Sequence, residues 1–196
     1  MNGNFPTPRS SFILGRFISE SLCDSLDNKF KNKTLEKGVF FKSSNLSNID
    51  ETVKQSSDYN WKKNDLNEEL QKQYTNELNK IVELYREKYP FVDKTRLSVE
   101  GINYQLYPRG GGYKELHCEN LFNTSNSITN SRVLVFMTYL NNIADGGTFF
   151  PEQDLYVPSI KGLTLIWPAW FTHPHRSVVT HNSKKSIITG WMGFIV

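Results

Sequence analysis

The chain has 196 residues, of which 38% are hydrophobic and 13% aromatic, enough to build the core of one domain spanning residues 1–196. Its net charge of +3 is too small to favour nucleic-acid binding, and no apolar run reaches the roughly 20 residues of a membrane span. The N-terminus lacks the pattern of a secretory signal, and the two cysteines, Cys23 and Cys118, cannot form a disulfide framework. These features predict a cytoplasmic protein without a membrane partner.

The first third of the sequence predicts a short strand, a helix and a long loop. A strand is expected over residues 12–17, and Ser19 then caps a helix whose apolar face repeats at Leu22, Leu26 and Phe30. Residues 32–60 are rich in Asn, Lys and Ser and show little periodicity. We expect a loop there, with one short strand near residues 39–41.

A second, longer helix is expected between Asp65, as its cap, and Pro90, which ends it. Its apolar side chains follow one stripe at steps of three and four: Leu66, Leu70, Tyr74, Leu78, Val82, Tyr85 and Tyr89. Residues 1–95 are therefore predicted to form a helical support region.

The second half of the chain changes to a period of two, which is typical of strands. Residues 98–107 alternate clearly, and further strands are expected at 133–140, 155–157, 163–167, 173–178 and 186–194. Turn signals separate them at 109–112, 145–147, 161–162 and 181–183. Helices followed by many short strands predict an α+β fold in which an antiparallel sandwich or barrel over residues 96–196 carries the function.

His117-Cys118-Glu119 is the first candidate for chemistry, because residues i and i+2 of a strand point to the same face. A His-x-carboxylate pair is by itself a weak signal. Two histidines and one carboxylate on one face of an ion, however, make the facial triad of non-haem iron oxygenases. His173 and His175 are both candidates for the third ligand, and their equal parity leaves the choice open.

Several motifs follow one another in the second half: Tyr107-Pro-Arg-Gly-Gly-Gly-Tyr113, His117-x-Glu119, Tyr139-Leu-Asn141, Asp145-Gly-Gly-Thr148, Lys161-Gly-Leu-Thr-Leu-Ile-Trp-Pro-Ala169, His175-Arg176, Lys185 and Thr189-Gly-Trp191. In this order they resemble the prolyl 4-hydroxylase type of iron(II)- and 2-oxoglutarate-dependent dioxygenase, with small phage-encoded members the most similar. The resemblance covers roughly the last half of the chain. It implies a double-stranded β-helix, or jelly-roll, core of the cupin-like kind, and the host cytoplasm as the location if a phage encodes the protein.

The resemblance also selects the third ligand. In the family a basic residue follows the distal histidine by nine or ten positions, and a tryptophan commonly follows that residue by six. Lys185 and Trp191 have these positions relative to His175 and not to His173. The implied metal ligands and catalytic residues are therefore His117, Glu119 and His175, with Fe(II) as the metal, 2-oxoglutarate and O2 as cosubstrates and ascorbate as a further cofactor.

Four residues are implied to bind the cosubstrate. Lys185 supplies a cation for the distal carboxylate of 2-oxoglutarate, Tyr107 donates a hydrogen bond to it, Thr189 assists, and Trp191 forms a wall of the metal pocket. Two features depart from the family pattern. Glu119 stands where most members have Asp, and the turn before Thr148 is one residue shorter, which leaves the role of Thr148 open.

The expected reaction is hydroxylation of a prolyl residue in a peptide or protein. Two alternatives remain: oxidation of a free amino acid, a nucleobase or another small molecule, or a non-catalytic jelly-roll module that binds or supports. Residues 120–130 form a polar stretch directly after the first ligands. It is interpreted equally well as a lid over the substrate or as a plain surface loop.

Overall fold

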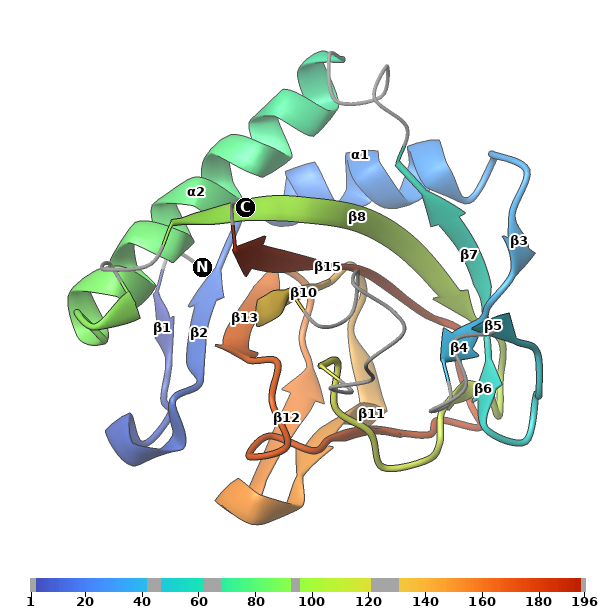
Figure 1. Cartoon of the computed structure of the whole chain (residues 1–196). Coiled ribbons are helices and arrows are strands. Elements are labelled where there is room, and N and C mark those ends of the chain that lie inside the picture. Colours follow the sequence, from blue (N-terminus) through green and yellow to red (C-terminus); the bar gives the residue numbers. More distant parts are fainter. Residues whose placement is uncertain (1–2, 42–46, 62–67, 93–95, 121–130, 195–196) are drawn as a thin grey trace.

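A computed structural model describes residues 3–41, 47–61, 68–92, 96–120 and 131–194. Its largest element is an eight-stranded sheet (Figure 1). The strands lie in the order β1 (Asn4–Phe5), β2 (Leu14–Phe17), β13 (Leu163–Pro168), β10 (Arg132–Tyr139), β15 (Lys185–Phe194), β8 (Leu97–Tyr107), β7 (Ser57–Asn60) and β3 (Glu36–Lys37). All the described pairings in this sheet are antiparallel.

A smaller three-stranded sheet faces the main one and has the order β12 (Leu155–Ser159), β11 (Ile143–Phe150) and β14 (Arg176–Val178). Two short pairs complete the strands: β4 (Phe40–Phe41) with β5 (Ser47–Asn48), and β6 (Lys54–Gln55) with β9 (Gly112–Tyr113). Short 3-10 turns occupy Arg9–Ser11 and Pro151–Gln153. The two facing sheets form the jelly-roll core expected from the sequence.

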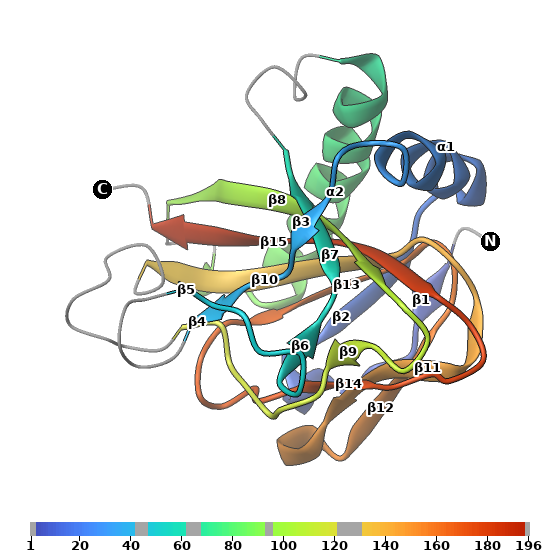
Figure 2. The same cartoon turned by 90° about the vertical axis from the view of Figure 1, so that its right-hand side faces the viewer.

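Two helices, α1 (Glu20–Phe30) and α2 (Glu69–Lys88), cover the face of the main sheet that lies away from the small sheet (Figures 1 and 2). Ser19 caps α1 as predicted, and its hydroxyl accepts from the Leu22 N–H. Glu68 occupies the cap position of α2, whereas Asp65 and Leu66 lie outside the described residues. No helix in the described part of the chain is long and apolar enough to cross a bilayer.

Strand alternation divides the core into two clusters. On β8, Ile102 and Tyr104 pack under the helices, while Tyr107 belongs to the cluster between the sheets. On β15, Ile188 faces the helices, and Ile187 and Trp191 face the small sheet. The period of two therefore directs one set of side chains into the space between the sheets, as the sequence predicts.

The short strand expected near residues 39–41 is present as β4, but the loop expected over the rest of residues 32–60 is wrong. This segment forms β3 to β7, and β7 pairs with β8 to extend the main sheet, with β3 beyond it. These strands have two to four residues each; β7 and β3 lie at one side of the main sheet, and β4, β5 and β6 belong to the two short pairs. A strand this short shows no period that a sequence pattern could detect.

The turn expected at residues 145–147 is also wrong, because Asp145, Gly146 and Gly147 lie within β11. The pairing with β12 shifts register between Ile143 and Gly147, as in a β-bulge. A Cβ atom on Gly147 would lie 2.2 Å from the Val157 carbonyl oxygen. The glycine therefore permits a close approach of two strands and does not make a turn.

The strand expected over residues 173–178 begins later, since β14 covers only Arg176–Val178. His175 lies just before it, in an isolated antiparallel bridge with His117. The other predicted turns hold, and Gly110 and Gly162 have positive φ angles of 74° and 83°. Of residues 120–130, the stretch considered as a lid, all but Asn120 lie outside the described residues.

Candidate metal centre

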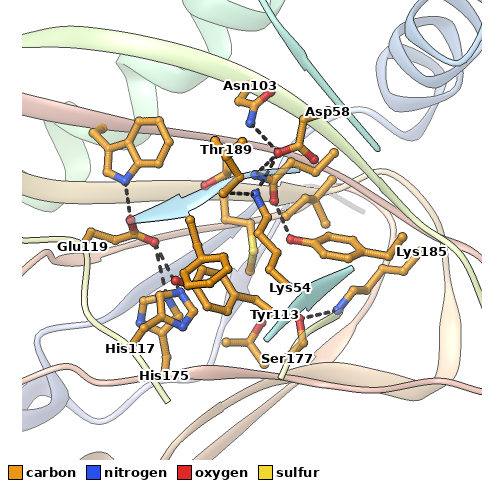
Figure 3. Close-up of a pocket in the computed structure, with 18 of the residues that line it drawn as sticks. Lys54, Asp58, Asn103, Tyr113, His117, Glu119, His175, Ser177, Lys185 and Thr189 are labelled. Atoms are coloured by element: carbon orange, nitrogen blue, oxygen red, sulfur yellow. Dashed lines mark hydrogen bonds and ion pairs between the residues drawn. The ribbon is translucent and has the colours of Figure 1, made fainter. Parts of the chain in front are cut away.

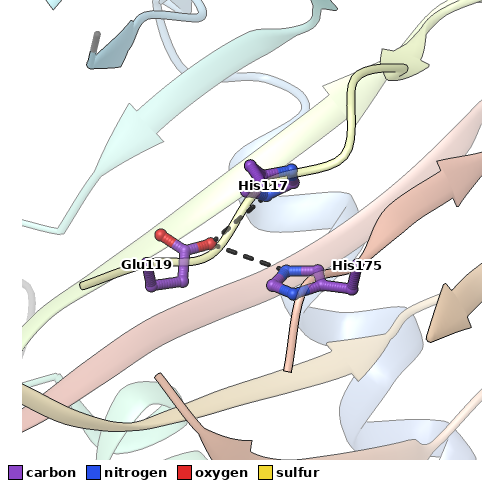
Figure 4. Close-up of side chains that lie close together, drawn as sticks. All are labelled: His117, Glu119 and His175. Carbon is purple, nitrogen blue, oxygen red and sulfur yellow. Dashed lines mark ion pairs between the residues drawn. The ribbon is translucent and has the colours of Figure 1, made fainter. Parts of the chain in front are cut away.

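His117 and His175 are joined by their backbones before any side chain is considered. The His175 N–H donates to the His117 carbonyl at 2.8 Å, and the His117 N–H donates back at 3.1 Å. Glu119 follows two residues after His117, and its backbone N–H donates to the Ala169 carbonyl at 3.1 Å. This pairing brings two distant segments of the chain together, so that the three side chains converge (Figure 4).

The three side chains are close enough to hold one ion. The Glu119 Oε1 atom lies 3.5 Å from His117 Nε2 and 3.7 Å from His175 Nε2. One ligand atom from each residue lies within 4.8 Å of the other two. Two imidazoles and one carboxylate on one side, with the opposite side facing a cavity, fit a divalent ion of the Fe(II) type.

Backbone carbonyls orient both imidazole rings for metal binding. His117 Nδ1 lies 3.0 Å from the Glu115 carbonyl, and His175 Nδ1 lies 3.0 Å from the His173 carbonyl. Carbonyl oxygens only accept, so each Nδ1 carries the proton and each Nε2, which lies on the side of Glu119, is the ring atom left to bind an ion. Burial lowers the pKa of His117, which favours the neutral ring that a metal needs.

The second oxygen of Glu119 has partners of its own. Oε2 accepts from Trp191 Nε1 at 3.0 Å and from Arg132 Nη1 at 3.4 Å, and the Arg132 guanidinium lies 3.8 Å above the Trp191 ring. Burial alone would raise the pKa of Glu119, but the two nearby histidines and Arg132 hold it well below its usual range. Glu119 is therefore a carboxylate with one oxygen turned toward the histidines and the other fixed behind it.

Replacing Trp191 by phenylalanine is expected to weaken metal binding about tenfold, because removing a group that orients a ligand typically costs ten- to a hundredfold. The ring still packs, but Glu119 Oε2 loses its indole donor. Titration of Co(II) into the wild type and W191F, followed by visible absorption, measures the change. Equal affinities would show that the indole N–H does not orient Glu119.

His173 lies outside this group. Its Nε2 is 2.8 Å from the Ser11 carbonyl and its Nδ1 is 2.9 Å from the Thr172 hydroxyl. The ring therefore ties the N-terminal segment to the loop before β14. What His173 gives to His175 is its backbone carbonyl, which the sequence could not reveal.

A cavity of about 330 Å³ lies next to the three side chains (Figure 3). Lys185 lines it, is only 2% exposed, and donates to Ser177 Oγ at 3.0 Å. Within the described part of the chain, no carboxylate forms an ion pair with this ammonium. Burial lowers the pKa of Lys185 to about 8. The cavity therefore holds a buried cation that has no paired anion among the residues that the structure describes.

The other residues predicted to bind the cosubstrate also line the cavity. Tyr107 donates its hydroxyl proton to Gln105 Oε1 at 2.5 Å, and its ring lies under Lys185, with the Nζ atom 4.9 Å from the ring centroid. Thr189 donates to the Phe136 carbonyl at 2.9 Å. Both hydroxyl protons therefore already have partners within the protein.

Sequence reasoning missed several residues that line the same cavity: Lys54, Asp58, Asn103, Gln105, Arg132 and Ser177. Ser177 shares the parity of His175 and could have been found by that signal. Lys54 and Asp58 come from the segment without periodicity. Thr148, whose role was left open, lines the cavity and shares a 2.7 Å hydrogen bond with the Tyr139 hydroxyl.

Comparison with known proteins gives no matching family model and no curated protein of similar sequence. Solved structures do match. A viral collagen prolyl hydroxylase from Paramecium bursaria Chlorella virus-1, solved with 2-oxoglutarate, aligns with a TM-score of 0.69 at 15% identity, over 94% of this chain and 97% of that one. A Pseudomonas putida prolyl-4-hydroxylase aligns with a TM-score of 0.69 at 14% identity, covering 94% of each chain.

A third match is a Trichoplax adhaerens prolyl hydroxylase in complex with a peptide fragment of the hypoxia inducible factor oxygen degradation domain. Its TM-score is 0.68 at 15% identity, over 94% of this chain and 84% of that one. At this level of identity the likeness establishes the fold. The chain therefore has the fold of the prolyl 4-hydroxylases, a jelly-roll core with supporting helices on one face.

Proposed function

We propose that this protein is an iron(II)- and 2-oxoglutarate-dependent dioxygenase that hydroxylates a prolyl residue in a peptide or protein. The observation that carries the proposal is the pairing of two sites in one cavity. One is the His117, Glu119 and His175 group, with both Nε2 lone pairs turned inward. The other is the buried ammonium of Lys185, which lacks a paired carboxylate among the described residues.

Each of these groups has a task. The three ligands hold Fe(II), and Lys185 binds the distal carboxylate of 2-oxoglutarate. With iron bound, the site converts 2-oxoglutarate, O2 and a C–H bond into succinate, carbon dioxide and an alcohol, and ascorbate keeps the iron reduced. The protein places the cosubstrate and shields it from water, since Lys185 and His175 are both buried.

The choice of a peptide substrate is supported by the fold neighbour that was solved with a peptide. Oxidation of a free amino acid, a nucleobase or another small molecule is the second candidate. A non-catalytic binding module is the third. Screening proline-containing peptides against free amino acids and nucleosides, with substrate-dependent succinate release as the readout, separates the first two.

The oxygenase proposal is tested by loading the purified protein with Fe(II) and 2-oxoglutarate without oxygen. A weak visible charge-transfer band is expected, followed by slow succinate release when air is admitted with ascorbate present. A module without turnover predicts neither signal. Absence of both the band and succinate would therefore refute the proposal.

The affinity for 2-oxoglutarate is expected to be highest below pH 8 and to fall as the pH rises above it. The pKa of the Lys185 ammonium is about 8 without ligand, and a bound carboxylate raises it, so binding is strongest where the lysine is already protonated. Anaerobic titrations at pH 7 to 9.5 measure this dependence. Lys185→Arg, which stays charged throughout, is expected to flatten the profile, and an equally steep profile in that variant would contradict the assignment.

A further inference from the structure

The proposed function assigns no role to the side of the cavity that is lined by Lys54 and Asp58. It is built around an ion pair between Lys54 and Asp58, with Nζ and Oδ2 2.7 Å apart and side chains only 5% and 7% exposed. Lys54 also donates to the Val39 carbonyl at 3.1 Å. Desolvation makes a buried ion pair costly to form, so the pair depends on hydrogen bonds to the groups around it.

Asp58 holds two amide side chains of β8. Its Oδ2 atom accepts from Asn103 Nδ2 at 3.3 Å and from Gln105 Nε2 at 3.4 Å (Figure 3). A carboxylate paired with a lysine can only accept, so the NH2 group of Gln105 must face Asp58. The carbonyl oxygen of Gln105 is then turned the other way, toward Tyr107.

Tyr107 completes the chain of contacts. Its hydroxyl donates to Gln105 Oε1 at 2.5 Å, and burial raises the pKa of the phenol well above its usual value, so it keeps its proton. The ring lies beneath the Lys185 ammonium, 4.9 Å from Nζ to the centroid. One end of the ring is thus anchored to Gln105, and its face meets the cation.

We propose that Lys54, Asp58 and Gln105 form a relay of hydrogen bonds that fixes the Tyr107 ring against Lys185 and so positions the cation for its ligand. That the ligand is 2-oxoglutarate rests on the proposed function. The relay makes Gln105 and Asp58 positioning residues, since they act through Tyr107. It also differs from the expectation that Tyr107 donates to the cosubstrate, because in the relay the Tyr107 hydroxyl proton stays in its hydrogen bond to Gln105.

A competing arrangement predicts the opposite change in 2-oxoglutarate affinity when the Gln105 amide is removed. If Tyr107 leaves Gln105 and donates to the bound carboxylate, then Gln105 competes with the ligand, and removing its amide strengthens binding. If the relay positions the ring, removing the amide weakens binding. The Gln105→Met variant separates the two, because methionine has a similar length and no hydrogen-bonding amide.

Binding of 2-oxoglutarate to the Mn(II)-loaded protein is measured by calorimetry. Q105M and Y107F are each expected to weaken it about fivefold, the size expected for one buried hydrogen bond. The double variant is expected to be no weaker than either single one, because both changes break the same contact. Tighter binding in Q105M, or fully additive losses, would overturn the relay.

Tyr104→Phe is the matched control, since it removes a phenol hydrogen bond from the same strand, to Asp27 at 3.0 Å, on the helix-covered side. It is expected to leave binding unchanged. The ion pair is tested by the double variant K54M/D58L, because changing Asp58 alone would leave a buried unpaired ammonium. This variant is expected to weaken 2-oxoglutarate binding as Q105M does, and unchanged binding would remove the ion pair from the relay.

A readout without metal or cosubstrate distinguishes failure of the relay from failure of the proposed function. In the metal-free protein, the Tyr107 hydroxyl proton is expected as a slowly exchanging, downfield NMR resonance that Y107F removes and Q105M shifts. If the wild type binds no 2-oxoglutarate while this pattern holds, the proposed function fails and the hydrogen bonds of the relay stand. A resonance that Q105M leaves in place would refute the relay itself.

Discussion

Replacing His175 by alanine is expected to lower the affinity for Fe(II) or Co(II) by more than about 100-fold, since even residues that only support a ligand contribute ten- to a hundredfold. His175 Nε2 lies 3.7 Å from Glu119 Oε1, and its ring packs against Trp167 at a centroid distance of 5.0 Å. The remaining pair, His117 and Glu119, is a chelate of two ligands only. Metal titration followed by visible absorption measures the loss.

His173→Ala is the matched control for this prediction. Alanine keeps the backbone carbonyl that accepts from His175 Nδ1, so metal affinity is expected to stay within about threefold of the wild type. Losing a group that orients a ligand would instead lower the affinity about tenfold or more. The variant does lose the buried contact with the Ser11 carbonyl, so the free energy of unfolding is expected to fall by about 1–3 kcal/mol. If His173→Ala abolishes metal binding and His175→Ala does not, the ligand assignment is wrong.

Replacing Lys185 by methionine is expected to raise the 2-oxoglutarate concentration for half-saturation about 30-fold or more, the usual cost of losing one partner of a buried charge pair. Methionine keeps much of the stem but removes the cation that contacts Ser177 and Tyr107 in the cavity. Affinity for the metal alone is expected to be unchanged, because Lys185 is not among the three ligands. Separate titrations with metal and with 2-oxoglutarate measure the two effects.

The same change is expected to stabilise the protein. Burial shifts the pKa of Lys185 from 10.5 to about 8, so an unliganded charged lysine costs on the order of 3 kcal/mol of unfolding free energy at pH 7. This cost is fully present below pH 8 and disappears as the pH rises toward 10.5. In urea unfolding at pH 7, the free energy of unfolding of K185M is expected to be higher than that of the wild type.

Lys184→Met supplies the control, since Lys184 is exposed and directly precedes Lys185, the first residue of β15. Neither 2-oxoglutarate affinity nor stability is expected to change in that variant. A K185M protein that binds 2-oxoglutarate as well as the wild type would remove Lys185 from the cosubstrate site. Loss of stability in K185M would instead indicate that the contacts of the ammonium with Ser177 and Tyr107 outweigh the cost of its burial.

The sequence by itself determined features that depend on neighbouring residues. The stripe of α2 is buried at Tyr74, Leu78 and Val82 as its helical period predicts, and Ile187, Thr189 and Trp191 share the inner face of β15. Periods of 3.6 and 2 follow from local backbone geometry, so a pattern of apolar residues is enough to detect them. The same argument placed His117 and Glu119 on one side.

Tertiary structure decided what depends on partners far along the chain. Glu119 Oε2 is fixed by Arg132 and Trp191, which are 13 and 72 residues away in the sequence. Gln105 donates to Asp58, which is 47 residues away. Short strands such as β7 form because β8 offers backbone groups to pair with, and their own residues carry no period. The metal ligands could therefore be proposed from strand parity and the family resemblance, whereas the groups that orient them depend on contacts that only folding creates.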